Sequence, residues 1–231
     1  MNIAIIVAAG RGSRAGGVRA KQFREISGIP IIIHTLSRFE LCETIESAVV
    51  VLPGDARDEF LSLAVEHGLR RVWRAVPGGE TRAESVWRGL QSLEGAEVGG
   101  VVAVHDGVRP FVTPAEIDRT VREAEAHGAA VLAAPAVETI KEAAEGRVVR
   151  TLERARLWHA QTPQCFRYEL LRRAYEQPGA LGADVTDCSA LVERLGETVR
   201  LVEGSADNIK ITTPRDFAIA EVLVHKFRFG S

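Results

Sequence analysis

The chain has few of the residues that build metal centres, disulfide frameworks or covalent catalytic sets. Its three cysteines, Cys42, Cys165 and Cys188, are widely spaced and form no Cys-x-x-Cys pair, which is typical of a protein kept in a reducing cytoplasm. No two histidines have metal-ligand spacing, and no serine–histidine–acid or cysteine–histidine set is recognisable. These absences favour chemistry that depends on positioning and charge over chemistry that needs a covalent nucleophile.

Excess charge of one sign and long apolar runs are lacking as well. The net charge is −2 over 231 residues, so no basic surface indicates nucleic acid or an anionic membrane as a partner. The apolar run at residues 3–9 has no basic residue before it and ends in glycine and arginine, unlike a signal segment. No other stretch is long enough to span a membrane. We expect a cytoplasmic protein whose cationic character is confined to a site.

Short apolar runs alternate with segments of helical periodicity. Strands are predicted at residues 2–8, Ser47–Leu52, Leu69–Trp73, Gly100–His105, Ala129–Ala133 and Thr198–Val202. Helices are predicted over Ile31–Phe39, Asp55–His67, Arg82–Leu93, Pro114–His127 and from Pro214 to about Phe227, with a capping box at Thr113. The alternation predicts one α/β domain over residues 1–231, with a mostly parallel sheet between two helical layers.

One segment, at about residues 136–156, interrupts this alternation of strands and helices. Glu138–Lys141 and Arg147–Leu152 are short, β-like and joined by Ala143-Ala144-Glu145-Gly146, so we expect a β-hairpin arm projecting from the body. An isolated two-stranded hairpin is only marginally stable in water. The arm is therefore expected to pack on another surface, for which a second subunit is the natural candidate.

The most informative segment begins where the first strand ends. Strand 2–8 runs into the glycine-rich loop Ala9–Gly17, which contains Arg14, and Lys21 follows closely. Glycines let backbone N–H groups approach phosphate oxygens, while the two cations supply charge. The loop lacks the Gly-Lys-Ser/Thr of a P-loop. A dinucleotide loop with Ala15 in the third glycine place stays open, as does a surface loop with solvated arginines.

Two further loops carry side chains suited to phosphate or metal. Asp106 follows a buried strand and could hold magnesium, with Arg109 placed to bind a phosphate; the alternative is a turn capped by Asp106. Pro77–Ser85 is a second glycine loop that opens a helix. This loop either binds a base or ribose, or is a plain strand-to-helix connection in which Glu80 or Thr81 caps the helix.

Two segments near the C-terminus complete the candidate set. Thr186-Asp187 stands at a helix start, where capping is the favoured role and substrate contact the other. Asp207 and Lys210 could complete a divalent-metal and phosphate site, or pair with each other on the surface. His105 is expected to be structural. Scattered cations near glycine loops, with two aspartates that could share a magnesium ion, favour phosphoryl or nucleotidyl transfer.

Taken in order, these motifs resemble the 2-C-methyl-D-erythritol 4-phosphate cytidylyltransferases of the non-mevalonate isoprenoid pathway, over nearly the whole chain. Many nucleotidyltransferases share the opening loop, so the more specific motifs lie later in the chain. They are Leu157-Trp158-His159-Ala160-Gln161-Thr162-Pro163-Gln164 and Glu203-Gly204-x-x-Asp207-Asn208-Ile209-Lys210. The chain departs from the family pattern at Gly107-Val108, where Ala-Ala or Ser-Ala is expected.

The resemblance implies a Rossmann-like three-layer sandwich of the nucleotidyltransferase fold, forming a homodimer that exchanges the β-hairpin arm. It implies transfer of a cytidylyl group from CTP to methylerythritol phosphate, with magnesium and release of pyrophosphate. CTP would be held by Ala8, Ala9, Gly10, Gly79, Glu80, Ser85 and Asp106. Arg14 and Lys21 would stabilise the transition state.

The same resemblance assigns the second substrate and the metal. Arg154 and Lys210 would join Arg14 and Lys21 in catalysis. Methylerythritol phosphate would be bound and oriented by Asp106, Arg109, Thr139, Arg154, Thr186, Asp207 and Lys210. Magnesium would lie near Asp106 and Asp207. Because the arm is exchanged in this family, Thr139 and Arg154 would serve the site of the neighbouring subunit.

Other functions stay open at this point. The nearest is a ribitol-phosphate cytidylyltransferase of the same fold, followed by a sugar nucleotidyltransferase. A non-catalytic nucleotide-binding module would bind CTP without turnover, but it leaves Arg14 and Lys21 beside Asp106 unexplained. An NAD-binding oxidoreductase is a further alternative, and it lacks a persuasive acidic residue for the ribose.

Overall fold

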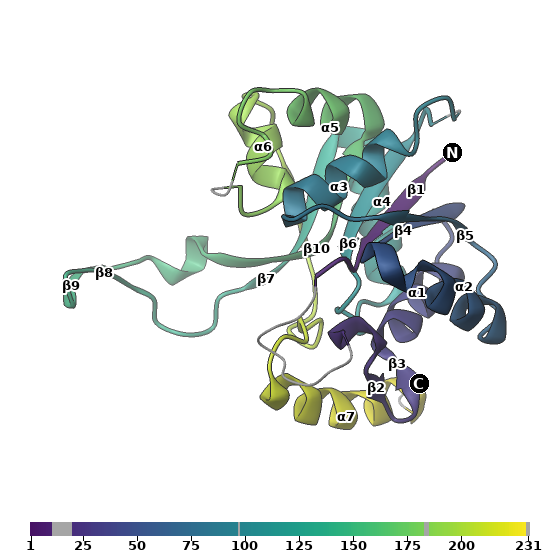
Figure 1. The fold of residues 1–231 in the computed structure, drawn as a ribbon. Helices are drawn as coiled ribbons and strands as arrows, with labels where there is room; N and C mark the ends of the chain where they lie inside the picture. Colours follow the sequence, from purple (N-terminus) through teal and green to yellow (C-terminus); the bar gives the residue numbers. More distant parts are fainter. Residues whose placement is uncertain (11–19, 97, 183–184, 230–231) are drawn as a thin grey trace.

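A mostly parallel sheet forms the centre of the computed structural model, which describes residues 1–10, 20–96, 98–182 and 185–229 (Figure 1). Within those residues, seven strands pair in the order β11-β7-β10-β6-β1-β4-β5. β10 is antiparallel to β6 and β7, and the other neighbouring pairs are parallel. The strands are β1 (Ile3–Val7), β4 (Ser47–Leu52), β5 (Val72–Pro77), β6 (Val101–Asp106), β7 (Ala129–Pro135), β10 (Trp158–Arg167) and β11 (Arg200–Glu203).

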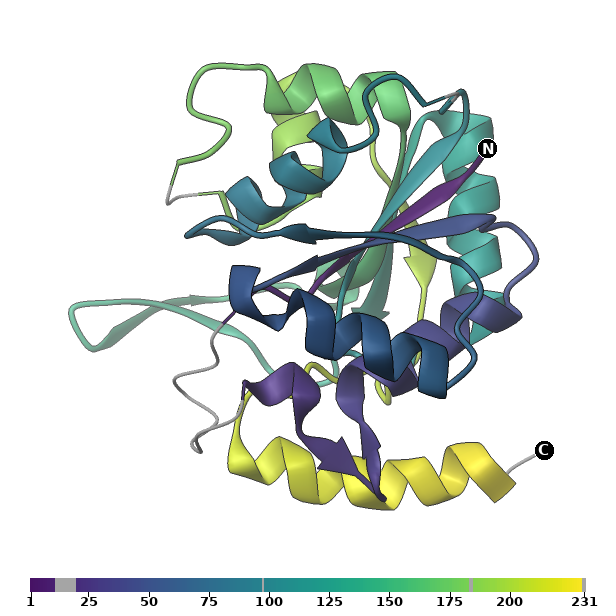
Figure 2. The same ribbon diagram turned by 45° about the vertical axis from the view of Figure 1, so that its right-hand side comes forward.

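Helices cover both faces of this sheet (Figure 2). α1 (Ile31–Leu41), α2 (Arg57–Glu66) and α4 (Pro114–His127) pack on one face, and α3 (Arg82–Gln91), α5 (Tyr168–Tyr175) and α6 (Cys188–Arg194) on the other. Along β1, Ala4 and Ile6 join the first core while Ile3 and Ile5 join the second, as the alternation of a strand requires. Burial on both faces explains why the strands read as continuous apolar runs, and the three-layer prediction is confirmed.

A third cluster of apolar side chains holds the C-terminal helix against the segment that leads out of the glycine loop. α7 (Pro214–Phe229) packs on the small hairpin of β2 (Glu25–Ile26) and β3 (Ile29–Pro30), with Ile26, Ala220 and Val224 buried together. The carboxylate of Glu221 accepts hydrogen bonds from the backbone N–H and hydroxyl of Ser27. This packing anchors the one-turn 3₁₀ helix Lys21–Phe23 that precedes β2.

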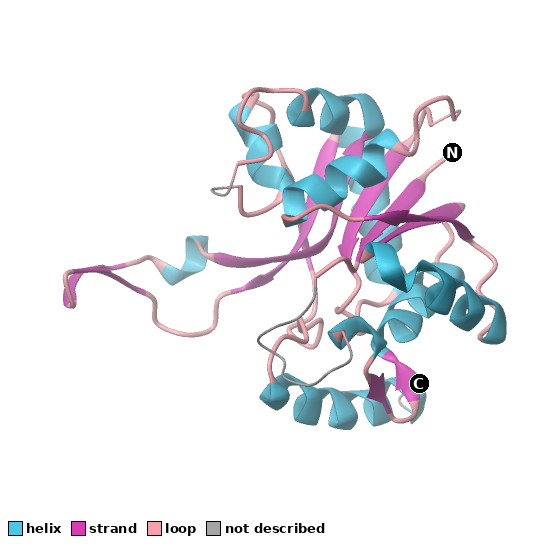
Figure 3. Ribbon diagram, in the orientation of Figure 1, coloured by secondary structure: helices cyan, strands magenta, loops and turns pink. Residues whose placement is uncertain are grey.

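The predicted hairpin projects from the body as an extended arm (Figure 3). It consists of β8 (Lys141–Ala144) and β9 (Arg147–Thr151), and both strands are exposed along their whole length. Its two-residue turn places Glu145 at φ 50° and Gly146 at φ 75°, which is the conformation that matches strand twist in tight hairpins. The first strand begins three residues later than predicted.

Most element boundaries agree with the sequence-based expectations, and the capping box at Thr113 is formed. The strand predicted at Leu69–Trp73 is wrong in position: residues 69–71 connect α2 to β5, and the strand runs from Val72 to Pro77. β10 and α5 were not predicted. None of the described helices is both long and apolar enough to cross a membrane.

Candidate active site

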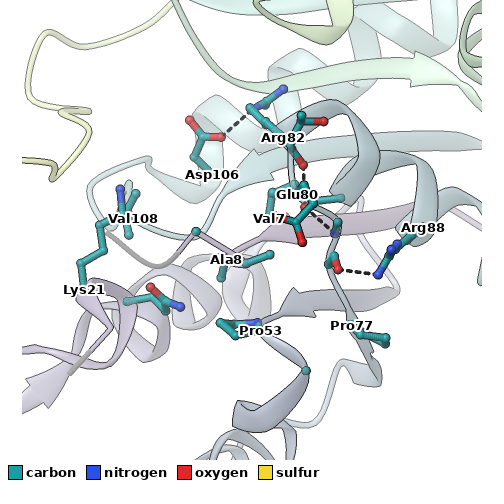
Figure 4. A pocket seen from close by; sticks show the side chains of 18 of the residues that line it. Val7, Ala8, Lys21, Pro53, Pro77, Glu80, Arg82, Arg88, Asp106 and Val108 are labelled. Atoms are coloured by element: carbon teal, nitrogen blue, oxygen red, sulfur yellow. Dashed lines mark hydrogen bonds and ion pairs between the residues drawn. The ribbon is translucent and has the colours of Figure 1, made fainter. Parts of the chain in front are cut away.

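The loops that follow β1, β4, β5 and β6 surround a cavity of about 660 Å³ (Figure 4). These four strands are parallel, so their carboxyl ends meet at one edge of the sheet, which is where α/β proteins bind ligands. The cavity brings together predicted residues that are far apart in the sequence. They are Ala8, Ala9, Gly10, Lys21, Gly79, Glu80, Ser85, Asp106 and Lys210.

The lining of the cavity has more positive than negative side chains. Its cationic residues are Lys21, Arg82, Arg88 and Lys210, against Glu80 and Asp106, although the whole chain has a net charge of −2. Figure 4 shows Lys21 and Arg88 on opposite sides of the cavity. A concave site with a local excess of positive charge favours an anionic ligand such as a polyphosphate.

Asp106 lies at the centre of this charge pattern, at the end of β6. Its carboxylate accepts from Arg82 Nε at 3.0 Å and from Lys210 Nζ at 2.8 Å, and Arg109 Nε lies 3.6 Å away. Burial alone would raise the pKa of Asp106, but the attraction of Arg82 and Lys210 outweighs it and holds that pKa well below its usual range. Asp106 is therefore ionised at neutral pH, and the three cations share one negative partner.

Arg82, which the sequence analysis did not single out, is the first residue of α3 and links this carboxylate to α6 in the same helical layer. Its guanidinium binds Asp106 and also donates to Cys188 Sγ at 3.6 Å, at the start of α6. Burial works against the charged form of Arg82, yet the attraction of Asp106 raises its pKa above the ordinary value.

The N-cap of α6 is Asp187, as predicted. Gln164 stabilises that cap: its amide NH₂ donates a hydrogen bond to the Asp187 carboxylate, and its amide oxygen accepts one from the Cys188 backbone N–H.

The second glycine loop is packed so closely that only glycine fits. A Cβ at Gly78 would lie 2.1 Å from the Cβ of Ala9, and one at Gly79 would lie 2.4 Å from the Cβ of Glu84. Ser85 Oγ accepts from the Gly79 backbone N–H and donates to the carbonyl of Thr81, which is the N-cap of α3. The connection is thus capped by Thr81, as one of the two interpretations had it, and it also forms a wall of the cavity. Contact with a base or ribose stays a prediction.

His105 is buried beneath the site and has a structural role, as expected. Thr162 Oγ1 accepts from the backbone N–H of Asp106 at 3.1 Å and lies 3.0 Å from His105 Nδ1, so its hydroxyl hydrogen is directed at that nitrogen. His105 Nε2 then donates to the carbonyl of Arg109 at 3.1 Å. Burial lowers the pKa of His105 from 6.5 to about 4, so the ring is neutral at pH 7.

This depressed pKa predicts an acid-sensitive fold. Between pH 6.5 and about 4 the unfolded chain binds a proton at His105 that the folded chain excludes. The free energy of unfolding should therefore fall by about 3 kcal/mol over that interval because of His105. Urea unfolding at a series of pH values measures this. His105→Asn, which keeps an acceptor for Thr162, should flatten the dependence, and an equally steep curve in that variant would contradict the assignment.

The remaining predicted residues lie outside the cavity lining or outside the described part of the chain. Arg109 binds the carbonyl of Asn208 beside Asp106, and Asp207 pairs with Lys226 of α7. Lys210 pairs with Asp106, so of the two alternatives for Asp207 and Lys210 the surface pair between them is wrong. Thr139 and Thr186 are exposed. Arg154, at the base of the arm, donates to the carbonyl of Val137. Arg14 lies outside the described residues.

The donor set around the cavity fits a metal ion that arrives with a polyphosphate. Among the described residues, no three His, Cys, Asp or Glu side chains are grouped so that they could hold a metal. Asp106 is the carboxylate at the cavity floor, and Arg82 and Lys210 already occupy its two oxygens. Magnesium commonly binds one or two carboxylates and completes its shell with substrate phosphates and water, which is compatible with this arrangement.

A three-layer α/β fold with a cationic cavity at the carboxyl ends of its strands is the architecture of a nucleotide- or phosphate-binding protein. The family model of 2-C-methyl-D-erythritol 4-phosphate cytidylyltransferase matches residues 2–226. A protein of that name from Pelotomaculum thermopropionicum is 44% identical over 223 residues, which cover 96% of this chain and 93% of that protein. The chain therefore belongs to the 2-C-methyl-D-erythritol 4-phosphate cytidylyltransferase family, and it is a cytidylyltransferase.

Solved structures agree with this assignment. The 4-diphosphocytidyl-2C-methyl-D-erythritol synthase of Anaerococcus prevotii superposes with a TM-score of 0.84 at 28% identity, over 97% of this chain and 96% of that one. The 2-C-methyl-D-erythritol 4-phosphate cytidylyltransferase of Thermus thermophilus gives a TM-score of 0.77 at 32% identity, over 96% of this chain and 98% of that one. The resemblance inferred from the sequence motifs is confirmed at the level of family and fold.

Proposed function

We propose that the cavity binds CTP and joins its cytidylyl group to 2-C-methyl-D-erythritol 4-phosphate, giving 4-diphosphocytidyl-2-C-methyl-D-erythritol and pyrophosphate. The observation that carries this proposal is the convergence of Lys21 and Lys210, far apart in the chain, on one cavity at the strand ends. Gly10, Gly78 and Gly79 are among the lining residues, and the absence of side chains there allows a ligand to approach the backbone closely.

The reaction proceeds by in-line attack at the α-phosphorus of CTP. A phosphate oxygen of the second substrate forms the new P–O bond, the bond to the β-phosphate breaks, and pyrophosphate leaves. Two anions approach each other in this step, so positioned cations reduce the barrier most effectively in a water-poor site. We assign stabilisation of the transition state to Arg14 and Lys21, and orientation of the attacking phosphate to Lys210 and Arg154.

We propose that magnesium accompanies the triphosphate. When bound there, the ion neutralises phosphate charge and orients the leaving group. Asp106 and Asp207 are the carboxylates assigned to it. Of these, Asp106 lines the cavity, whereas Asp207 pairs with Lys226. Lys210 is 39% exposed on its side chain, so it has room to move from Asp106 toward a bound phosphate.

Methylerythritol phosphate is assigned to a set of residues that is only partly inside one chain. Asp106 and Lys210 line the cavity, Arg109 lies beside Asp106, and Thr186 immediately precedes the α6 cap. Asp207 lies outside the lining, paired with Lys226. Thr139 and Arg154 belong to the arm, which extends away from the body in Figures 1 and 3. We propose that they complete the cavity of a partner subunit. The exposed side chains of Val137, Val148 and Val149 at 72%, 63% and 58% support an arm that packs on a partner.

A complementation experiment tests the shared site. Lys21→Ala disables the cavity of its own chain, and Arg154→Ala disables the arm that serves the neighbour. After mixing under conditions that exchange subunits, half of the dimers are mixed, and each has one intact site. Activity should return to roughly a quarter of the wild-type value. Light scattering measures the dimer itself. A monomer, or a mixture that stays inactive despite subunit exchange, would contradict the exchanged arm.

Substrate choice is tested by pyrophosphate release from each nucleoside triphosphate with each polyol phosphate. We expect rapid release with CTP and methylerythritol phosphate, and far slower release with ribitol phosphate or with ATP, GTP and UTP. Release with ribitol phosphate but not methylerythritol phosphate would reverse the assignment of the second substrate.

We further propose a single domain over residues 1–231 with the arm of about residues 136–156 inserted into it, and a cytoplasmic location. Cys42, Cys165 and Cys188 are all free thiols and buried, which is in keeping with a reducing compartment.

A further inference from the structure

Gln22 is a buried polar side chain in the wall of the cavity whose amide has no partner among the described residues. It belongs to the turn Lys21–Phe23 and lines the cavity beside Lys21, yet the residue is only 1% exposed. In the part of the chain that the structure describes, neither its amide nitrogen nor its amide oxygen makes a hydrogen bond. The roles proposed above leave this residue without a function.

The other buried glutamines behave differently. Gln161 donates to the carbonyl of Ser205 and accepts from Asn208. Gln164 donates to Asp187 and accepts from the Cys188 backbone N–H. Buried primary amides are bonded in this way because taking them out of water without a partner is unfavourable. A buried amide that lies in a cavity wall and has no hydrogen-bond partner in the protein is typical of a position where a bound ligand supplies the hydrogen bonds.

The backbone around Gln22 keeps the side chain in this place. The Phe23 N–H donates to the carbonyl of Ala20, and the Arg24 N–H donates to the carbonyl of Lys21, so the turn is closed by its own hydrogen bonds. The Phe23 side chain is buried in the core beneath the cavity. These contacts fix the backbone of the turn from which the Gln22 side chain lines the cavity.

The charge of the cavity indicates which ligand atoms meet this amide. Lys21, Arg82, Arg88 and Lys210 make the lining suitable for an anion, and an amide NH₂ is a neutral, directional donor to a phosphate oxygen. The amide oxygen needs a donor, and a nucleotide offers one in its ribose hydroxyls. A nucleoside triphosphate thus supplies partners for both ends of the amide, whereas inorganic phosphate supplies them for one.

We propose that Gln22 is a nucleotide-binding residue of this cavity, whose NH₂ group donates to the triphosphate of CTP while its amide oxygen accepts from the ribose. The inference rests on the proposed binding of CTP in the cavity and adds a neutral contact to the cationic ones. It predicts an unusual combination for a buried residue: replacing the amide weakens ligand binding without weakening the ligand-free fold.

The test compares Gln22→Met and Gln22→Glu with the wild-type chain, using calorimetric titration with CTP and magnesium and the unfolding midpoint without ligand. Gln22→Met keeps the length of the side chain and should weaken CTP binding by about tenfold or more. Its ligand-free midpoint should stay unchanged or rise, because no hydrogen bond is lost. Gln22→Glu keeps an acceptor but places a carboxylate against the triphosphate, so its affinity should fall further.

Gln164→Met is the matched control, since that amide is fully bonded within the protein. It should lower the unfolding midpoint. Titration with cytidine, which lacks the triphosphate, should show a smaller loss in Gln22→Met than titration with CTP does. Unchanged CTP affinity in Gln22→Met, or affinity in Gln22→Glu equal to that of the wild type, would overturn the role of Gln22. A wild-type chain that binds no CTP would instead refute the proposed function on which the inference rests.

Discussion

Replacing Lys21 with alanine should lower kcat by about a hundredfold to a thousandfold while weakening CTP binding much less. Lys21 lines the cavity next to the end of β1, where the proposed reaction brings two anions together. A positioned cation that acts mainly as charge develops contributes about 3–4 kcal/mol to the transition state and little to the ground state. Steady-state kinetics with CTP and methylerythritol phosphate, together with a CTP binding titration, separates the two effects.

Arg122→Ala provides the control for this loss of charge. Arg122 pairs with Glu43 on the surface of the α4 layer, and both side chains are more than half exposed. Its removal should leave kcat within about twofold, since an exposed ion pair contributes little. Equal turnover of Lys21→Ala and the wild-type chain would exclude Lys21 from catalysis, and a loss confined to CTP affinity would make it a binding residue only.

Removing the carboxylate of Asp106 should destabilise the fold by about 3 kcal/mol, the second large effect. Its side chain is 7% exposed and is the shared negative partner of Arg82, Lys210 and Arg109. Asp106→Ala would leave these cations close together without a negative partner. We place the effect at the lower end of the range for buried pairs because Lys210 is 39% exposed and can turn toward water.

Two comparisons distinguish this effect from the loss of any ion pair. Glu142→Ala removes the exposed partner of Arg150 on the arm and should change the free energy of unfolding by less than about 1 kcal/mol. Pyrophosphate should raise the unfolding midpoint of Asp106→Ala more than that of the wild type, because an anion can replace the lost carboxylate. A variant of wild-type stability would show that Asp106 does not hold the three cations.

The elements with regular patterns could be predicted from the sequence. α4 begins and ends where its capping box and apolar spacing indicated, at Pro114 and His127, and β4 matches Ser47–Leu52. β10 was missed because its polar residues and Pro163 interrupt the alternation of a strand. Its pairing with β7 is irregular between Ala160 and Gln164. β10 pairs with β6 on one side and β7 on the other. This pairing depends on tertiary contacts, which no local sequence pattern encodes.

The candidate site was predictable where strand ends and glycine loops coincide. Ala8 and Asp106 stand at the ends of the buried strands β1 and β6, and Gly79 follows the edge strand β5, so a shared edge of the sheet brings them together. Lys210 was a candidate for a phosphate site, but its position on Asp106 depends on a fold that its own neighbourhood in the sequence does not reveal. Arm residues such as Arg154 are assigned by resemblance, and a single chain does not bring them to its own cavity.

Arg82 and Gln22 were missed for a different reason. Each lies inside a family motif, Lys21-Gln22-Phe23 or Gly79–Ser85, yet nothing in its spacing separates it from a solvated side chain. Arg82 becomes significant because Asp106 and Cys188 lie on either side of its guanidinium. Gln22 becomes significant because its amide is buried and unpartnered within the described residues. The sequence offers one weak signal for Gln22: it is a polar residue that follows the predicted phosphate loop and directly precedes the aromatic residue Phe23.

A crystal structure of the complex with CTP and magnesium tests the central claim most directly. The account predicts that the nucleotide occupies the cavity at the ends of β1, β4, β5 and β6. Its base should lie against Gly79, Glu80 and Ser85, with its triphosphate directed to Lys21 and Lys210. A nucleotide bound elsewhere, or one whose phosphates point away from these lysines, would contradict the account.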